Sequence, residues 1–201
     1  MRSRAAASIF SREGFGEVYS MEGGINAWKG LVAKGVPDAG MAYFEPAKRA
    51  EELIALAWLL EEGSRKFYAE MARREKDREA VGLFNELLAD EEGHKTSLSR
   101  LHQTLSDQKP DPGFPGSLIS IEPGVEYLEG GMLLSEALEW VRGKEVRETL
   151  DLSISLEVNA VDLYIKMERK VKEKEARQVF QALSNQERNH LKRLSSLLER
   201  R

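Results

Sequence analysis

Apolar side chains recur at helical spacing along most of the chain from residue 45 onward. Four segments each present one apolar face, marked by Leu53 to Met71, Phe84 to Leu101, Leu150 to Tyr164 and Phe180 to Leu197, and this period predicts four long amphipathic helices. Residues 106–131 interrupt the pattern with four prolines and several glycines, which is typical of a long connection. The order of helix pair, long crossover and helix pair predicts an all-α four-helix bundle.

Two shorter segments do not belong to these four helices. Ser135 is expected to cap a short helix that runs to Trp140. Residues 1–40 differ in composition, with Val18-Tyr19 as a strand candidate between two short helical stretches. Such a small α/β piece cannot bury a core by itself. We therefore expect an N-terminal fragment at 1–40 and a helical domain at 45–201.

The composition narrows the classes of partner and of site. A net charge of −4 gives no reason to expect nucleic acid or a membrane as a partner, and we expect a cytoplasmic protein because no apolar run approaches the ~20 residues of a membrane span. The chain has no cysteine, which excludes a disulfide framework, a thiolate-held iron–sulfur centre and a cysteine nucleophile. Any metal must therefore be bound by oxygen and imidazole nitrogen.

The two predicted helix pairs repeat each other in their acidic residues and histidines. In each pair a glutamate is followed, thirty residues later, by the first residue of a Glu-x-x-His motif. Residues three apart on a helix share a face, so the Glu and His of one motif can bind the same ion or adjacent ions. The repeated residues are Glu61, Glu91 and His94 in the first pair, and Glu157, Glu187 and His190 in the second.

All six residues lie on the apolar faces, and this placement calls for cations. Burying an unpaired carboxylate costs several kcal/mol, and four converging carboxylates also repel each other. Two divalent ions supply four positive charges against the four glutamates. Carboxylate with imidazole suits iron or manganese better than copper or structural zinc, and magnesium rarely takes two imidazoles. We expect two iron ions, with manganese as the alternative.

Residues 45–201 resemble the rubrerythrin and bacterioferritin branch of the ferritin-like family. The resemblance rests on the stretch from Glu61 to Tyr68 and on the run from Asp90 to His94. One Glu from each of two helices plus a Glu-x-x-His from the other two is the known pattern of ferritin-like carboxylate proteins. The resemblance implies a ferritin-like bundle with one long crossover, usually as a homodimer. It gives each residue a role: terminal ligands Glu61 and Glu157, bridging ligands Glu91 and Glu187, and one imidazole per metal from His94 and His190.

The same resemblance implies a set of residues around the ligands. Tyr68 is expected beside the site, where it is the candidate catalytic donor of a proton or an electron. Tyr164 occupies the matching position of the second pair. Asp90 and Gln186 precede the two Glu-x-x-His motifs, and each is expected to hydrogen-bond the histidine of the opposite motif and set its tautomer.

The chain also departs from its relatives. Rubrerythrins carry an additional Glu where Ala160 stands here, and usually a Glu where His190 stands. They also have a cysteine-rich domain that this chain lacks, so its electron donor is unknown. Bacterioferritin holds haem through a Met at the position of Glu92, so we expect no haem. His102 is expected to be a near-surface helix residue.

The N-terminal segment resembles the C-terminal third of a rhodanese domain. The matching stretches are Arg2 to Ala7, Gly14-Phe15, Val18-Tyr19 and Glu22 to Trp28. In that family the catalytic cysteine lies just before the Arg-Ser pair, and this chain has no cysteine, so we expect no sulfurtransferase activity from it as given. Our hypothesis is that the natural gene encodes a rhodanese–rubrerythrin fusion and that this chain is a truncated form of it.

Three functions remain open at this point. The first is a diiron oxidoreductase that reduces hydrogen peroxide or dioxygen, with peroxide preferred on the resemblance to rubrerythrin. The second is a ferroxidase or another iron-handling protein, which the ligand set fits equally well. The third is a non-catalytic dimerisation module attached to a sulfurtransferase. Metal content separates the third function from the first two.

Overall fold

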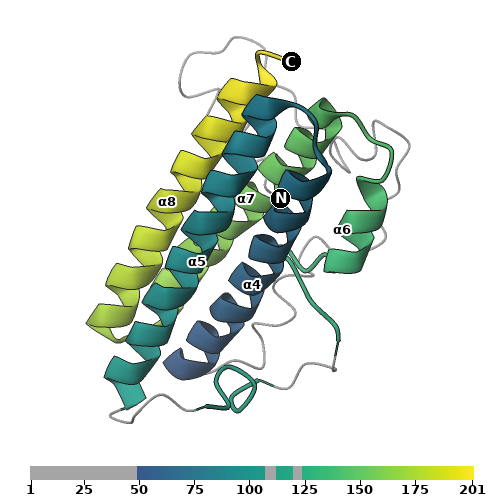
Figure 1. Cartoon of the computed structure of the whole chain (residues 1–201). Helices are drawn as coiled ribbons and strands as arrows, with labels where there is room; N and C mark the ends of the chain where they lie inside the picture. Colours follow the sequence, from purple (N-terminus) through teal and green to yellow (C-terminus); the bar gives the residue numbers. More distant parts are fainter. Residues whose placement is uncertain (1–48, 107–111, 120–123) are drawn as a thin grey trace, which may run out of the picture. The chain divides into compact units, whose positions relative to one another are not determined.

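The computed structural model describes residues 49–106, 112–119 and 124–201. These ranges contain no strand, and none of their helices is both long and apolar enough to cross a bilayer. The α/β character and the rhodanese resemblance expected for residues 1–40 lie outside this part of the chain. The helices are α4 (Ala50–Arg74), α5 (Arg78–Ser106), α6 (Leu134–Trp140), α7 (Val146–Lys170) and α8 (Lys174–Leu198) (Figure 1).

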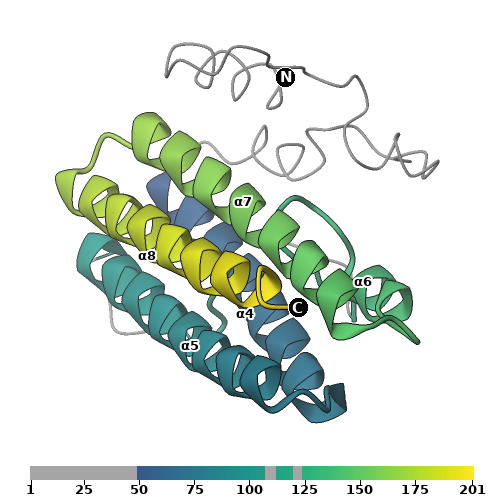
Figure 2. The ribbon, with the colours of Figure 1, turned by 90° about the horizontal axis from the view of Figure 1, so that it is seen from above.

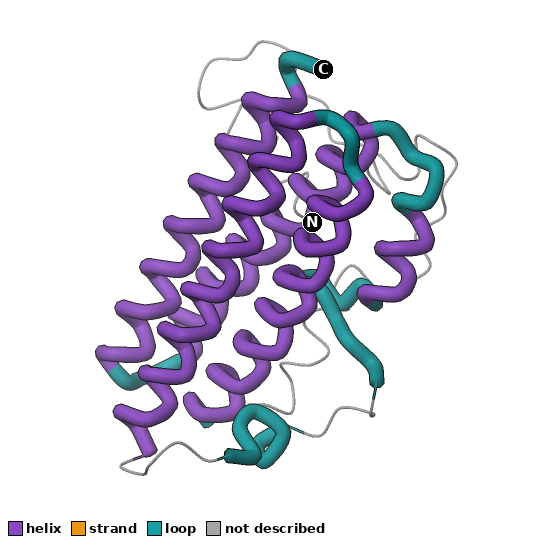
Figure 3. The backbone as a smooth tube through the Cα atoms, viewed as in Figure 1, coloured by secondary structure: helices purple, strands orange, loops and turns teal. Residues whose placement is uncertain are grey.

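The four long helices form a bundle of two pairs. α4 packs along α5 and α7 packs along α8, and the two pairs meet through α5 and α8. The view from above in Figure 2 shows the four long helices running alongside one another, with α6 outside them. Short connections make the partners of each pair antiparallel, and the long crossover joins α5 to α7, as the tube in Figure 3 shows. The predicted all-α ferritin-like bundle is therefore confirmed.

The helix starts are fixed by local hydrogen bonds. The Asp77 carboxylate accepts hydrogen bonds from the backbone N–H of Glu79 and of Ala80 and so caps the start of α5.

The prediction that Ser135 caps the short helix is wrong, because α6 already begins at Leu134 and Leu133 occupies the capping position. The helix begins two residues earlier than expected, directly after the isolated backbone bridge between Leu133 and Tyr127.

Two apolar clusters fill the bundle, one toward each end. The first includes Leu53, Leu60, Leu98, Leu163 and Phe180. The second includes Phe67, Phe84, Leu87, Leu150 and Leu194. In every long helix the residues of one cluster are separated along the chain from those of the other by the predicted glutamates or histidines. The bundle core therefore has an apolar layer, a polar layer and a second apolar layer.

The crossover lies against α4 at Gly63, where the two backbones approach closely. A Cβ atom at Gly63 would overlap the carbonyl oxygen of Tyr127. The absent side chain thus lets the crossover reach the bundle at the level of the polar layer.

We expect Gly63→Ala to lower the free energy of unfolding by about 2 kcal/mol, because the crossover must move away from α4 to relieve the overlap. Gly82→Ala on α5 is the matched control, since nothing lies within 4 Å of a Cβ atom there. That control should stabilise the protein by up to about 1 kcal/mol through helix propensity alone. Urea denaturation of both variants checks this, and equal stability of the two would contradict the close approach.

The crossover also buries His102, so the prediction that His102 lies near the surface is wrong. The His102 side chain is only 7% exposed and its ring stacks on that of Phe114, with 4.4 Å between the centroids. The crossover segment that carries Phe114 therefore covers His102 on α5 and accounts for its burial.

Candidate metal centre

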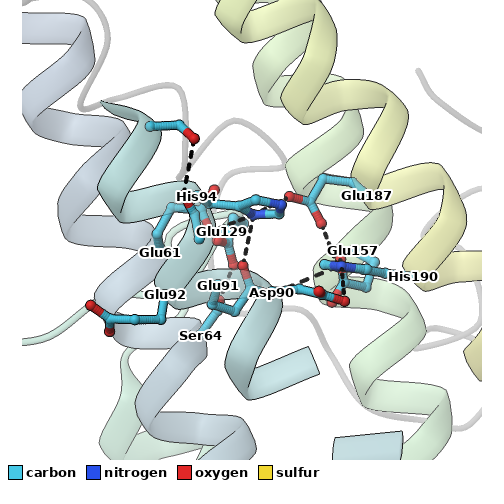
Figure 4. A network of polar contacts seen from close by, with 12 residues as sticks. Glu61, Ser64, Asp90, Glu91, Glu92, His94, Glu129, Glu157, Glu187 and His190 are labelled. Carbon is cyan, nitrogen blue, oxygen red and sulfur yellow. Dashed lines mark hydrogen bonds and ion pairs between the residues drawn. The ribbon is translucent and has the colours of Figure 1, made fainter. Parts of the chain in front are cut away.

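The six predicted ligands converge in the polar layer of the bundle. Each is at most 3% exposed, although four of them are carboxylates. α4 contributes one glutamate and α7 another, while α5 and α8 each contribute a Glu-x-x-His pair. Figure 4 shows these side chains pointing toward one another from the four helices, whereas Glu92 points away from the cluster.

The six residues form two overlapping groups, each with the composition of a metal site. The first group is Glu61, Glu91, His94 and Glu187, and the second is Glu91, Glu157, Glu187 and His190. Within each group one potential ligand atom per residue lies within 4.8 Å of all the others. Because Glu91 and Glu187 belong to both groups, they occupy the place of carboxylates that bridge two ions.

The imidazoles direct the same ring nitrogen toward the carboxylates. His94 Nδ1 lies 3.1 Å from a Glu61 oxygen and 3.0 Å from a Glu91 oxygen. His190 Nδ1 lies 3.3 Å from a Glu157 oxygen. The two rings are stacked with 5.4 Å between their centroids. Nδ1 is therefore the nitrogen that each histidine offers to a metal.

The surroundings of Glu187 indicate that the six side chains are arranged for binding a cation rather than for hydrogen bonding to one another. The Glu187 oxygens lie 3.0 Å from His94 Nδ1 and 2.8 Å from His190 Nδ1, yet neither oxygen has a hydrogen-bond partner within the described part of the chain. Buried carboxylate oxygens without such partners are costly. The oxygens and ring nitrogens converge on common points, as ligands of one ion do, so the residues present fit a bound metal pair.

Without metal, protons supply the positive charge of the site. Burial and the neighbouring charge of Glu187 raise the pKa of Glu157 to about 8, and burial with the charges of Glu61 and Glu187 raises the pKa of Glu91. Burial alone would lower the pKa of His190, but its hydrogen bond to Glu157 and its close contact with the Glu187 carboxylate outweigh burial and raise the pKa to about 10. The metal-free site thus holds excess protons, which bound cations would displace.

Two tyrosines connect the helix pairs across the site. The Tyr68 hydroxyl of α4 donates a hydrogen bond to Glu157 of α7, and the Tyr164 hydroxyl of α7 donates one to Glu61 of α4. Burial, and then the nearby carboxylates, raise the pKa of both phenols well above the ordinary value, so both remain neutral donors. Each tyrosine therefore orients the terminal glutamate of the other half.

We expect Tyr68→Phe and Tyr164→Phe each to weaken metal binding by about tenfold or more, because hydrogen bonds to ligands set their orientation. Competition against a chelator of known affinity measures the change. Tyr127→Phe is the control, since that tyrosine belongs to the crossover and is none of the six candidate ligands. An unchanged affinity in both site variants would contradict the orienting role.

The two histidines differ on the side that faces away from the cluster. His190 Nε2 lies 3.3 Å from a carboxylate oxygen of Asp90, and Arg193 donates a 2.9 Å hydrogen bond to that same oxygen. His94 Nε2 has no hydrogen-bond partner among the described residues. The expected contact of Asp90 with the opposite histidine is present, whereas the expected hydrogen bond from Gln186 to His94 is not formed.

A polar cleft of about 370 Å³ opens between α5 and α8 beside the two imidazoles. Its lining includes Asp90, Gly93, Gln186 and both histidines. A Cβ atom at Gly93 would meet nothing within 4 Å. The cleft therefore gives a small polar molecule a path to the histidine side of the centre.

A further buried carboxylate escaped the sequence analysis. Glu129 lies in the crossover, is 3% exposed and accepts a hydrogen bond from the Ser64 hydroxyl. Burial, and then the charge of Glu61, raise its pKa well above the ordinary value. The crossover has no periodicity that could distinguish an inward from an outward residue. The only local signal was an acidic residue between Leu128 and the Gly130-Gly131 pair.

Comparison with known proteins finds similarity to a family model and to a solved structure. Residues 148–201 match the family model of rubrerythrin, and this segment includes Glu157, Glu187 and His190. A solved structure of a hypothetical protein from Pyrococcus furiosus is similar, with 25% identity and a TM-score of 0.57 over 82% of this chain and 95% of that one. No curated protein matches the chain. None of these comparisons shows a rhodanese-like fragment at residues 1–40, so that resemblance stays a prediction.

Proposed function

We propose that this protein holds two iron ions between the six converging residues and works as an oxidoreductase that reduces hydrogen peroxide or dioxygen. One observation carries the proposal: two groups of buried carboxylates and imidazoles share Glu91 and Glu187, which supports a centre of two adjacent ions. The rubrerythrin match over α7 and α8 supports iron as the metal. Carboxylate-rich sites with one imidazole per ion also suit iron by ligand type.

When bound, the iron pair supplies the two electrons that, with two protons, convert hydrogen peroxide to two water molecules. The chain's own residues hold the centre in a buried layer between two apolar clusters, which limits the access of water. The Tyr68 hydroxyl keeps its proton and donates a hydrogen bond to the Glu157 carboxylate, so we assign Tyr68 as a candidate proton donor. The cleft between α5 and α8 is the route by which peroxide would reach the site.

The experiment that tests this function compares two oxidants on the reduced, iron-loaded full chain. Iron is first measured by metal analysis, with two ions per chain expected. The protein is then mixed either with one equivalent of hydrogen peroxide in the absence of air or with air-saturated buffer. Its near-ultraviolet absorbance is followed in both cases. We expect faster oxidation by peroxide. Equal rates, or no reaction with either oxidant, would contradict the peroxidase function.

Gly93→Phe should block the cleft without touching a ligand. We expect it to slow oxidation by peroxide about tenfold, a barrier increase of about 1.4 kcal/mol, with unchanged iron content. Gly82→Phe is the matched control, because it adds the same side chain to α5 where the surroundings are also open but away from the cleft. Stopped-flow rates of both variants check this, and equal rates would show that peroxide enters elsewhere.

Iron handling is the second candidate, and the same cleft supports it. Asp90 lines the cleft beside His190, and its carboxylate can attract a hydrated cation. The cleft could therefore admit Fe²⁺ as well as peroxide. Adding excess Fe²⁺ and air to the loaded protein distinguishes the two functions. Catalysed oxidation far beyond two ions per chain favours a ferroxidase, and oxidation that stops at two favours the peroxidase.

A further inference from the structure

Glu129 is a fifth buried carboxylate beside the candidate centre, and the function proposed above does not use it. It comes from the crossover rather than from a long helix. At 3% exposure it is as buried as the six ligands. It belongs to neither of the two groups of potential ligands, so it lies near the centre without being part of its immediate ligand set.

The crossover is packed so that Glu129 must face the bundle. On the α4 side the backbone of the crossover lies against Gly63 at Tyr127, and the close approach leaves no room for a side chain on Gly63. On the α7 side the Asn159 amide donates a 3.4 Å hydrogen bond to the Glu129 carbonyl oxygen and lies close over Gly130. Gly130 has a φ of +91°, in the left-handed region that favours glycine. The segment is thus held between α4 and α7, with the Glu129 side chain turned inward.

The carboxylate of Glu129 lies on the side of the centre opposite to the cleft. It accepts a hydrogen bond from Ser64 of α4, as Figure 4 shows. The charges of Glu61, Glu157 and Glu187 act on Glu129 and raise its pKa, and the charge of Glu129 acts in turn on both tyrosine hydroxyls. The cleft, in contrast, is lined by α5 and α8. Glu129 therefore approaches the terminal glutamates from the side that the crossover closes.

The balance of charge between the glutamates and the ions suggests a role for Glu129. Four ligand glutamates balance two divalent ions, but two trivalent ions carry two further positive charges. The hydroxyl of Ser64 is a neutral donor and offsets no charge, so burial of the Glu129 carboxylate is costly until a cation lies nearby. A fifth carboxylate in a layer of low dielectric gains most from the ion pair that carries the greater charge.

We propose that Glu129 is an outer carboxylate of the metal centre that stabilises its trivalent state over its divalent state. This inference rests on the proposed function, since it requires iron between the six converging residues. Glu129 acts here as a positioning and charge-balancing residue held by Ser64, and it does not replace any of the six ligands.

The test is the midpoint potential of the iron-loaded full chain, with and without the carboxylate. Glu129→Gln keeps the size of the side chain and can still bond to Ser64, but it removes the charge. We expect the preference for trivalent over divalent iron to fall at least tenfold, which is a rise of about 59 mV for a one-electron step. A reductive titration with mediators, followed by near-ultraviolet absorbance, measures this without any turnover assay.

Two further variants complete the test. Glu126→Gln removes a carboxylate from the same crossover, but that residue is half-exposed and paired with Lys66, so its potential should equal that of the wild type. Ser64→Ala should shift the potential in the same direction as Glu129→Gln, by less, and it gives a second reading if the first variant folds poorly.

The outcomes separate this inference from the proposed function. If the wild-type chain binds no iron, both fall together. If it binds two ions and Glu129→Gln has an unchanged potential, only the role of Glu129 falls. If Glu129→Gln no longer retains two ions, Glu129 is needed to hold the metal and the outer role is wrong.

Discussion

Replacing both shared glutamates by alanine, in the variant Glu91→Ala/Glu187→Ala, should abolish iron binding at both positions at once. Each residue belongs to both groups of potential ligands, so the double variant leaves each ion with one terminal glutamate and one imidazole. Changes to residues that merely orient ligands already cost about 10–100-fold in affinity, and the loss of two ligands per ion should exceed that range. Metal analysis after dialysis against a weak chelator gives the iron content per chain.

The control for this double variant removes the same side chains from the same two helices at exposed positions. Glu86→Ala on α5 together with Glu175→Ala on α8 should retain full iron content, since both residues are exposed. Circular dichroism establishes that the site variant is still helical. A folded Glu91→Ala/Glu187→Ala protein that keeps two ions would show that the metal lies elsewhere.

The metal-free protein should lose stability as the pH rises from 6.5 to 8. The pKa of Glu157 is raised from 4.5 to about 8 and that of His190 from 6.5 to about 10. In this interval the folded state therefore binds more protons than the unfolded state, and the free energy of unfolding falls with increasing pH. One excess proton corresponds to about 1.4 kcal/mol per pH unit, so we expect a loss on the order of 2 kcal/mol.

Urea denaturation of chelator-treated protein at the two pH values measures this loss. The iron-loaded protein should not follow it, because bound cations have already displaced the protons, and metal affinity should increase with pH for the same reason. Glu157→Gln removes one of the groups whose pKa is raised, so its metal-free form should show a shallower pH dependence. Stability of the metal-free wild type that increases over this interval would contradict the excess of bound protons.

The helices and the convergence of the six candidate ligands could be predicted because both follow from regular spacing. A helical period of apolar residues defines which face is buried, and the glutamates fall on that face together with Leu60 and Leu156. The thirty-residue separation places each first glutamate level with the Glu-x-x-His motif of its antiparallel partner. The convergence of four helices on one polar layer needs nothing beyond these two regularities.

The surroundings of the centre could not be predicted in the same way, because they depend on contacts between unlike segments. Asp90 and Gln186 hold equivalent positions, yet only Asp90 approaches the opposite histidine. Arg193 of α8 holds Asp90 in place, whereas the equivalent position on α5 is Ser97, whose hydroxyl bonds to its own helix. Glu129 lies in a segment without any period, so its direction depends on tertiary packing alone.

The layered core has a consequence for how the protein unfolds. Each end of the bundle has its own hydrophobic cluster, and in the metal-free protein these are separated by a layer of buried carboxyl groups and imidazoles. Such a molecule has two weakly coupled folding units, which can open one at a time. Cations between them would tie all four helices together at mid-height, and local opening at either end would then require the whole chain to unfold. Loading with iron should thus make the folding of the bundle cooperative, as well as enabling its chemistry.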